Sequence, residues 1–157
     1  MIKKIIFSLF TLFLLISQLH AITVDMGGNK IDSYNQAIKK IIKANKFEKK
    51  EKLKKANNFY NQALNYLYKA NKERPGDPDI YSYLGFVLNK KGNLIDAEIY
   101  YKLGLEINPN HIKINKYFGE LYVKTNRVNE AKERLNVLKS CNCKEYKQLK
   151  EIIKGNN

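Results

Sequence analysis

The sequence predicts an all-α protein, a short solenoid of antiparallel helix pairs that ends in a C-terminal capping helix. Three observations support this fold class. Proline is scarce, with 3 residues among 157, whereas residues that favour helices are abundant. Apolar residues recur at helical spacing in the stretch YSYLGFVLNKKGNLIDAEIYYKLGLEINP, residues 81–109. Similar residues also return every 34 positions, which indicates a repeated structural unit.

Residues 1–21 have the layout of a secretory signal peptide. Two lysines give a basic start, an apolar run follows, and a polar stretch ends at Ala21, after which we expect cleavage. The apolar run is shorter than the roughly 20 residues that a membrane-spanning helix needs. The sequence therefore predicts an exported, periplasmic protein whose residues 22–30 are mobile after cleavage. The alternative is an uncleaved segment that anchors the chain.

Residues 31–75 form the first predicted unit after this segment, a diverged helical repeat that is rich in lysine. We expect one helix over residues 32–46, with Asp32 or Ser33 as its N-cap. A long basic helix is expected over about residues 49–73.

The stretch KKIIKANKFEKKEKLKK, residues 39–55, contains nine Lys and two Glu, in a chain whose net charge is +14. Such a segment can attract an anionic membrane surface or polymer. It can equally be a solvated helix surface, because Lys, Asn and Ile are frequent throughout this chain. We expect no nucleic-acid partner, because the chain is predicted to be exported.

The internal repeat emerges when the sequence is compared with itself at an offset of 34 residues. One partial copy is followed by two full copies, and large apolar, small and turn-forming residues each coincide. The coinciding positions are Ala63, Ala97 and Ala131; Leu67, Tyr101 and Leu135; Leu84 and Phe118; Gly85 and Gly119; Leu88 and Tyr122; and Pro75 and Pro109.

These residues and their period resemble the tetratricopeptide repeat (TPR) family, whose pattern combines an aromatic residue, Leu-Gly, Tyr, Ala, a second aromatic residue and Pro. Residues 78–111 match it nearly throughout, and residues 112–142 match less well, since Asn115 replaces the first aromatic residue. The stretch AKERLNVLKSCNCKEYKQLKEII also resembles small exported bacterial TPR proteins. The resemblance implies two antiparallel helices per repeat and a concave surface, lined by the first helices, that binds extended peptides.

Helix packing explains the small residues of the repeat. Gly85 and Gly119 fall inside first helices, where glycine costs up to about 1 kcal/mol relative to alanine, so a neighbouring helix must need the space. Larger residues fill the remaining gaps. The predicted packing residues are Tyr81, Leu84, Gly85, Leu88, Ala97, Tyr101, Pro109, Phe118, Gly119, Tyr122, Ala131 and Leu135.

The remaining elements follow from the repeat. Helices are expected over residues 79–91, 94–107, 112–125 and 128–140. Asn93 and Asn126 are placed in the turns inside the pairs, and the loop RPGDPD, residues 74–79, is a repeat boundary. A polar helix near 143–154, within a C-terminal unit of 143–157, should cover the exposed apolar end of the array.

Few residues carry latent chemistry. His111, the one histidine after the predicted signal peptide, is expected to begin a helix rather than to act as a base or a metal ligand. Cys141 and Cys143 leave three alternatives open, namely a structural disulfide, free or intermolecular thiols, and a redox or metal function. The sequence has no phosphate-binding loop and no Ser-His-Asp set. We therefore expect no enzyme activity, no cofactor and no metal site.

The partner surface is expected on the sides of the first helices that face away from the packing. The candidate residues are Ser82, Phe86, Asn89, Lys90, Lys116, Glu120, Val123 and Lys124. Among them, the asparagine and the three lysines can hold a peptide carboxylate through charge-assisted hydrogen bonds. The partner is then a protein or peptide of unknown identity. A solvated surface is the alternative for each position, and an apolar end of the array could instead form a homodimer.

Overall fold

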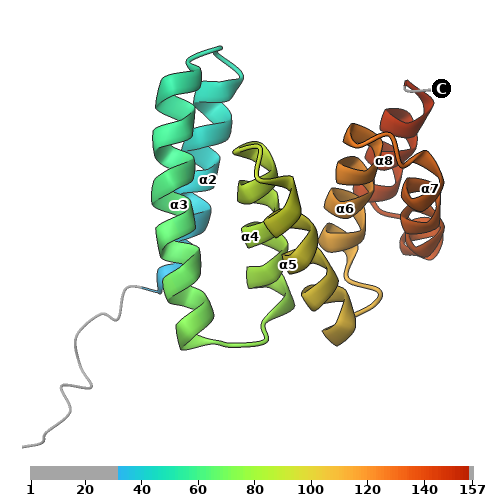
Figure 1. Ribbon diagram of the computed structural model, residues 1–157, viewed down its shortest axis with the longest axis horizontal. Coiled ribbons are helices and arrows are strands. Elements are labelled where there is room, and N and C mark those ends of the chain that lie inside the picture. The colour runs from blue at the N-terminus through green and yellow to red at the C-terminus, as the bar shows by residue number, and fades with distance from the viewer. Residues whose placement is uncertain (1–31, 156–157) are drawn as a thin grey trace, which may run out of the picture. The chain divides into compact units, whose positions relative to one another are not determined.

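The computed structural model describes residues 32–155. The predicted signal peptide, residues 1–21, and the segment 22–30 lie outside the described residues. The described chain is a run of helices joined by short turns, coloured in chain order in Figure 1. The elements are α2 (Ser33–Glu48), α3 (Leu53–Glu73), α4 (Pro78–Lys90), α5 (Leu94–Ile107), α6 (Ile112–Lys124), α7 (Val128–Val137), the 3-10 helix η2 (Leu138–Cys141) and α8 (Lys144–Lys154).

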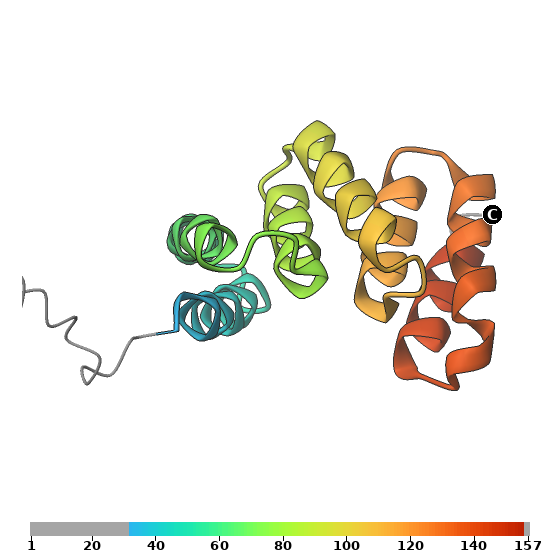
Figure 2. The ribbon, with the colours of Figure 1, turned by 90° about the horizontal axis from the view of Figure 1, so that it is seen from below.

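Neighbouring helices pack as antiparallel pairs, α2 with α3, α4 with α5, and α6 with α7 (Figure 1). Successive pairs meet where α3 contacts α4 and where α5 contacts α6, and α4 also contacts α6. The last helix, α8, packs against α6 and α7 (Figure 2). The predicted fold class, an all-α solenoid with a C-terminal capping helix, is confirmed, and the described residues form no strand.

Side-chain caps set the starts of the helices. Of the two caps predicted for α2, Asp32 is the one that acts, because its carboxylate accepts a hydrogen bond from the backbone N–H of Tyr34 (3.0 Å). Asp77 caps α4 by accepting from the N–H of Asp79 (2.9 Å). Pro78 occupies the first position of α4, where a missing N–H costs nothing. The helix therefore begins one residue earlier than predicted.

The predicted helix over residues 49–73 begins too early. Residues 49–52 form a turn in which Glu51 adopts a left-handed φ of 57°. The backbone N–H of Lys52 folds back onto the end of α2 with a hydrogen bond of 3.0 Å. These turn contacts separate the two helices, so α3 starts at Leu53.

The repeat glycines are sites of close helix contact. A Cβ at Gly85 would overlap the ring of Tyr101 on α5, and a Cβ at Gly119 would overlap the side chain of Leu149 on α8. Gly104, which was not among the predicted packing residues, is a third such position. These contacts explain why glycine is retained inside helices despite its unfavourable helix propensity.

The other predicted packing residues differ in burial. Tyr81, Tyr122 and Leu135 are half-buried, and Pro109 is exposed in the turn after α5, where it ends the helix rather than filling the core. The fully buried members are Leu84, Gly85, Leu88, Ala97, Tyr101, Phe118, Gly119 and Ala131.

The C-terminal end of the array is closed by η2 and α8. The predicted helix over residues 128–140 stops at Val137, and the chain continues as η2, whose Leu138 is buried. On α8, Leu149 and Ile153 are buried against the end of the array. Within residues 32–155, none of the helices has the length and apolar character that crossing a bilayer requires.

Candidate functional site

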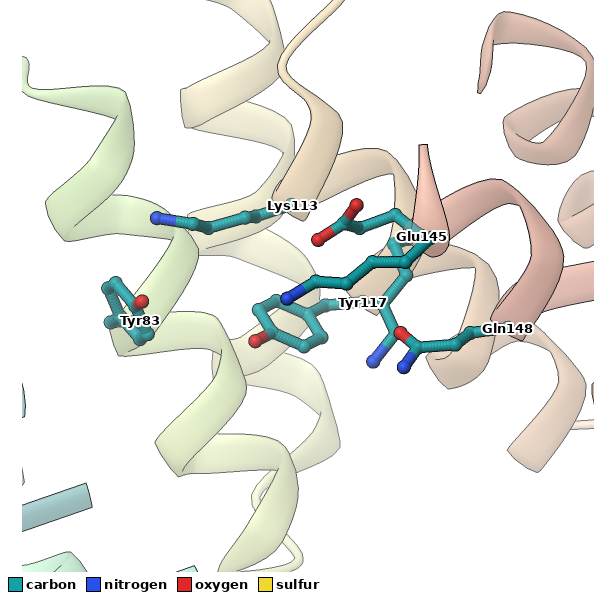
Figure 3. A pocket seen from close by; sticks show the side chains of 7 residues that line it. Tyr83, Lys113, Tyr117, Glu145 and Gln148 are labelled. Atoms are coloured by element: carbon teal, nitrogen blue, oxygen red, sulfur yellow. The ribbon is translucent and has the colours of Figure 1, made fainter. Parts of the chain in front are cut away.

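A cavity of about 290 Å³ opens between α4, α6 and α8, and we call it the α4–α6–α8 cavity. Figure 3 shows Tyr83 on α4 across from Lys113 and Tyr117 on α6, with Glu145 and Gln148 reaching in from α8. The lining residues are Tyr83, Lys113, Lys116, Tyr117, Lys144, Glu145 and Gln148.

The repeat itself places two tyrosines in this cavity. Tyr83 and Tyr117 are 34 residues apart, and each lies two residues before a repeat glycine, Gly85 or Gly119. Successive residues of an α-helix are rotated by about 100°, so each tyrosine points roughly away from its glycine. The glycine side packs against a neighbouring helix. The tyrosine side therefore faces the surface that this packing leaves open.

Lys113 is held from two directions. Its ammonium group donates a hydrogen bond to Oδ1 of Asp79 (3.0 Å) and lies 5.0 Å from the centre of the Tyr83 ring. Burial acts to lower the pKa of Lys113, but the hydrogen bond and the negative charge of Asp79 outweigh it, so the pKa is raised. Lys113 therefore stays cationic in a defined position at neutral pH.

Lys116 and Tyr117 form a second fixed group. The ammonium of Lys116 lies 2.8 Å from the carboxylate of Glu120 and 4.6 Å from the centre of the Tyr117 ring. Burial raises the pKa of Tyr117 to about 12. Its hydroxyl is therefore protonated at neutral pH and can donate a hydrogen bond to a bound group.

Lys144 is the one lysine of the cavity without a carboxylate partner among the described residues. It is the first residue of α8 and is exposed. Glu145 and Gln148 stand beside it in the lining and add acceptor and donor atoms. An anionic group entering the cavity could pair with Lys144 without displacing an existing ion pair.

Two of the residues predicted to contact a partner are buried, so their assignment is wrong. Ser82 and Val123 are 0% and 6% exposed. The reason is that α4 and α6 each pack against more than their own pair helix, which widens the buried arc of both. Phe86 is half-buried between Tyr60 and Tyr117, with ring centres 6.4 and 4.8 Å away. Its ring connects neighbouring helices instead of offering a free apolar contact.

The four residues expected to hold a peptide carboxylate do not converge. Lys116 lines the cavity. Lys124 lies eight residues further along α6, a distance of about 12 Å along the helix axis. There its ammonium donates to Oδ1 of Asn89 (3.1 Å), and nearby Lys90 pairs with Glu48 (3.0 Å). Asn89, Lys90 and Lys124 therefore form a separate group at the C-terminal ends of α4 and α6.

Of the predicted partner-binding residues, only Lys116 lines the α4–α6–α8 cavity. Tyr83 and Tyr117 could have been found, because they repeat at the period of 34 without belonging to the packing pattern. The three residues from α8 carry no such signal. Their helix is not a copy of the repeat, and only its packing against α6 brings them to the cavity.

Cys141 and Cys143 are joined by a disulfide with an S–S distance of 2.03 Å. The bond lies immediately before α8, and Cys141 packs against the C-terminal core. It therefore ties the chain at the point where α8, with its cavity residues, begins.

His111 begins α6, as expected. Its Nδ1 accepts a hydrogen bond from the backbone N–H of Ile114 (3.3 Å). Burial lowers the pKa of His111, in line with a neutral ring that accepts at Nδ1. Among residues 32–155 there is no group of three or more side chains placed to hold a metal ion.

Solved structures provide the comparison that decides the type of this helical array. The first TPR domain of Spaghetti (RPAP3), bound to the HSP90 peptide SRMEEVD, is 21% identical, with a TM-score of 0.55 over 78% of this chain and 94% of that chain. The TPR2B domain of yeast Sti1, in a complex with pHsp70, is 14% identical, with a TM-score of 0.58 over 77% and 95%. The TPR domain of Arabidopsis OM64 is 16% identical, with a TM-score of 0.56 over 80% and 99%. The chain has the TPR fold.

The TPR architecture predicted from the period of 34 residues is therefore confirmed at the level of fold. In this array α2, α4 and α6 are the first helices of the pairs, and α3, α5 and α7 are the second. The α4–α6–α8 cavity lies on two first helices and the capping helix. No family model and no curated protein matches the sequence.

Proposed function

We propose that this chain is a noncatalytic scaffold that binds a protein or peptide along the first helices of its TPR pairs, anchored in the α4–α6–α8 cavity. The observation that carries the proposal is the convergence of two fixed lysines, one unpaired lysine and two tyrosines on an open surface. Tyrosines give apolar area and a hydroxyl at little entropic cost, and lysines add charge-assisted hydrogen bonds. Such a lining suits a peptide segment that carries carboxylates.

The structural neighbours support a peptide-binding role. The RPAP3 domain is bound to the peptide SRMEEVD, and the yeast Sti1 domain is in a complex with pHsp70. SRMEEVD is rich in carboxylates, and the cavity of the present chain has three lysines against one glutamate. In our proposal a carboxylate of the partner pairs with Lys144, and Lys113 and Lys116 keep their own partners and set the electrostatic field around it.

Photo-crosslinking tests where the partner binds. A photoreactive residue in place of Gln148 reports on the cavity, and the same residue in place of the exposed Lys150 of α8 is the matched control. Both versions of the full chain are irradiated in cells that express it. We expect a discrete protein crosslinked through position 148 and not through position 150. Absence of a product at 148, or equal yields at both positions, would contradict the proposed site.

Charge variants of the full chain identify the group that binds. We expect Lys144→Gln to reduce the yield of the crosslink at position 148 strongly, because it removes the unpaired cation. A second variant, Asn89→Ala with Lys90→Ala and Lys124→Ala, tests the separate group at the ends of α4 and α6. It should leave the yield unchanged. If the second variant alone abolished the crosslink, the partner would bind at the ends of α4 and α6 and the cavity would not be the anchor.

We also propose that the chain is exported, on the basis of the basic, apolar and polar layout of residues 1–21. Cell fractionation and N-terminal sequencing of the purified product test this proposal. A product in the periplasm that begins at Ile22 is the expected result. A cytoplasmic product that begins at Met1 would contradict it.

A further inference from the structure

A second basic surface lies at the other end of the described chain, and we call it the lysine tip. It comprises residues 39–55, which are the end of α2, the turn after it and the start of α3. Nine of these residues are Lys, and every one of the nine except the half-buried Lys40 is exposed. The tip forms the upper end of the α2–α3 pair in Figure 1.

The charge of the lysine tip is not neutralised within the described part of the chain. None of its nine ammonium groups forms an ion pair there. Of its two glutamates, Glu48 is occupied by Lys90 of α4 (3.0 Å) and by the hydroxyl of Tyr60 (2.9 Å). Lys46 is spaced three and four residues from Lys49 and Lys50, an arrangement in which like charges repel. The fold itself gains nothing from this concentration of charge.

Apolar side chains are exposed among these lysines. Ile42 is 62% exposed and Leu53 is 66% exposed. Ile42 lines a hollow of about 410 Å³ together with Asn45, Lys46, Lys49 and Lys50. A purely electrostatic surface for a soluble polyanion has no use for exposed aliphatic side chains, because they remain in water when phosphates are bound.

The combination fits the boundary of an anionic lipid layer. Lysines extend their ammonium groups to headgroup phosphates, and their methylene stems and adjacent aliphatic side chains enter the apolar layer beneath. We propose that the lysine tip docks this chain onto an anionic phospholipid surface through its lysines, with Ile42 and Leu53 as shallow apolar contacts. This surface is separate from the α4–α6–α8 cavity, and the inference does not depend on the function proposed for that cavity.

Vesicle co-sedimentation of the full chain tests the inference. The readout is the ratio of the partition coefficient for phosphatidylcholine vesicles containing phosphatidylglycerol to that for pure phosphatidylcholine vesicles. Using this ratio removes any binding by the N-terminal apolar run that does not depend on lipid charge. Each lysine near an anionic surface contributes about fivefold in affinity. The variant Lys46→Gln, Lys49→Gln and Lys50→Gln should therefore lower the ratio by about a hundredfold.

A control with the same net charge separates the tip from the overall charge of the chain. The substitutions Lys132→Gln, Lys139→Gln and Lys147→Gln change three exposed lysines elsewhere and should leave the ratio within about twofold of the parent, since they lie outside the tip and its local field. Equal losses in both variants, or no loss in the tip variant, would overturn the inference. The cavity variant Lys144→Gln should bind vesicles as the parent does, so a failure of either proposal is visible without the other.

The apolar contacts distinguish a lipid surface from a soluble polyanion. The variant Ile42→Ser with Leu53→Ser should weaken binding to phosphatidylglycerol vesicles by tenfold or more and leave binding to a single-stranded oligonucleotide unchanged. If the serine variant bound vesicles as tightly as the parent, the tip would recognise charge alone and the membrane inference would be wrong. Circular dichroism of each variant confirms that the fold is retained.

Discussion

The α4–α6–α8 cavity and the lysine tip both gather lysines, but they treat the charge differently. In the cavity, Lys116 lies 2.8 Å from a carboxylate and 4.6 Å from a tyrosine ring, and Lys113 is held in a similar way. At the tip, lysines such as Lys46 and Lys49 are exposed and have no carboxylate partner among the described residues. Held cations suit a ligand of defined shape, whereas free cations suit a diffuse anionic surface.

The same difference predicts how each surface responds to its surroundings. Exposed charges separated by more than about 8 Å are screened at physiological ionic strength, so binding by the tip should fall steeply as salt is added. The cavity lysines are partly buried and already paired, and they are screened less. The two surfaces also depend on different parts of the fold, because the cavity needs α8 whereas the tip needs only α2 and α3.

The largest expected effect comes from the same substitution made in both regions. Leu149→Ala removes a fully buried side chain that joins α8 to α6, and it should lower the free energy of unfolding by about 3 kcal/mol. Leu53→Ala removes an exposed side chain at the tip and should change stability by less than about 0.5 kcal/mol. Urea unfolding followed by circular dichroism measures both. Similar losses in the two variants would contradict the assignment of α8 as a packed part of the array.

An alkaline titration sharpens the comparison, because the cavity contains tyrosines and the lysine tip contains none. Burial raises the pKa of Tyr117 from 10.0 to about 12, so the folded state favours the protonated phenol. The stability that this contributes is fully present below pH 10.0 and is lost as the pH rises toward 12. In Tyr117→Phe the fall in unfolding free energy over this range should be shallower, by at most about 1.4 kcal/mol per pH unit. Identical slopes in the parent and the variant would show that Tyr117 is not buried as described.

The fold could be predicted from the sequence because the repeat encodes packing at fixed spacing. Gly85 and Gly119 were identified from their offset alone, and the structure shows the helices that need the space. Helix ends were harder to predict, because they depend on individual caps. Pro78 looked like part of a loop until Asp77 was seen to cap the helix that Pro78 begins.

The candidate site was harder to predict than the fold, for two physical reasons. Facing away from one partner helix does not make a residue exposed when a second helix covers it, and this is why Ser82 is buried. A shared face also does not place residues side by side, and so Lys116 and Lys124 belong to different groups. The cavity depends further on Lys144, Glu145 and Gln148, whose positions come from the docking of α8 rather than from any repeated pattern.

The smallest expected effect has opposite signs on the two surfaces. Lys46→Gln with Lys49→Gln and Lys50→Gln should raise the free energy of unfolding by about 0.5 kcal/mol, because it removes like-charge repulsion along α2. Lys116→Gln should lower it by about 1 kcal/mol, because it removes the Glu120 ion pair and the contact with Tyr117. Urea unfolding at low and high salt measures both, and the gain at the tip should shrink as salt screens the repulsion. If the tip variant were instead destabilised, its lysines would serve the fold, and their number would no longer point to an external anionic surface.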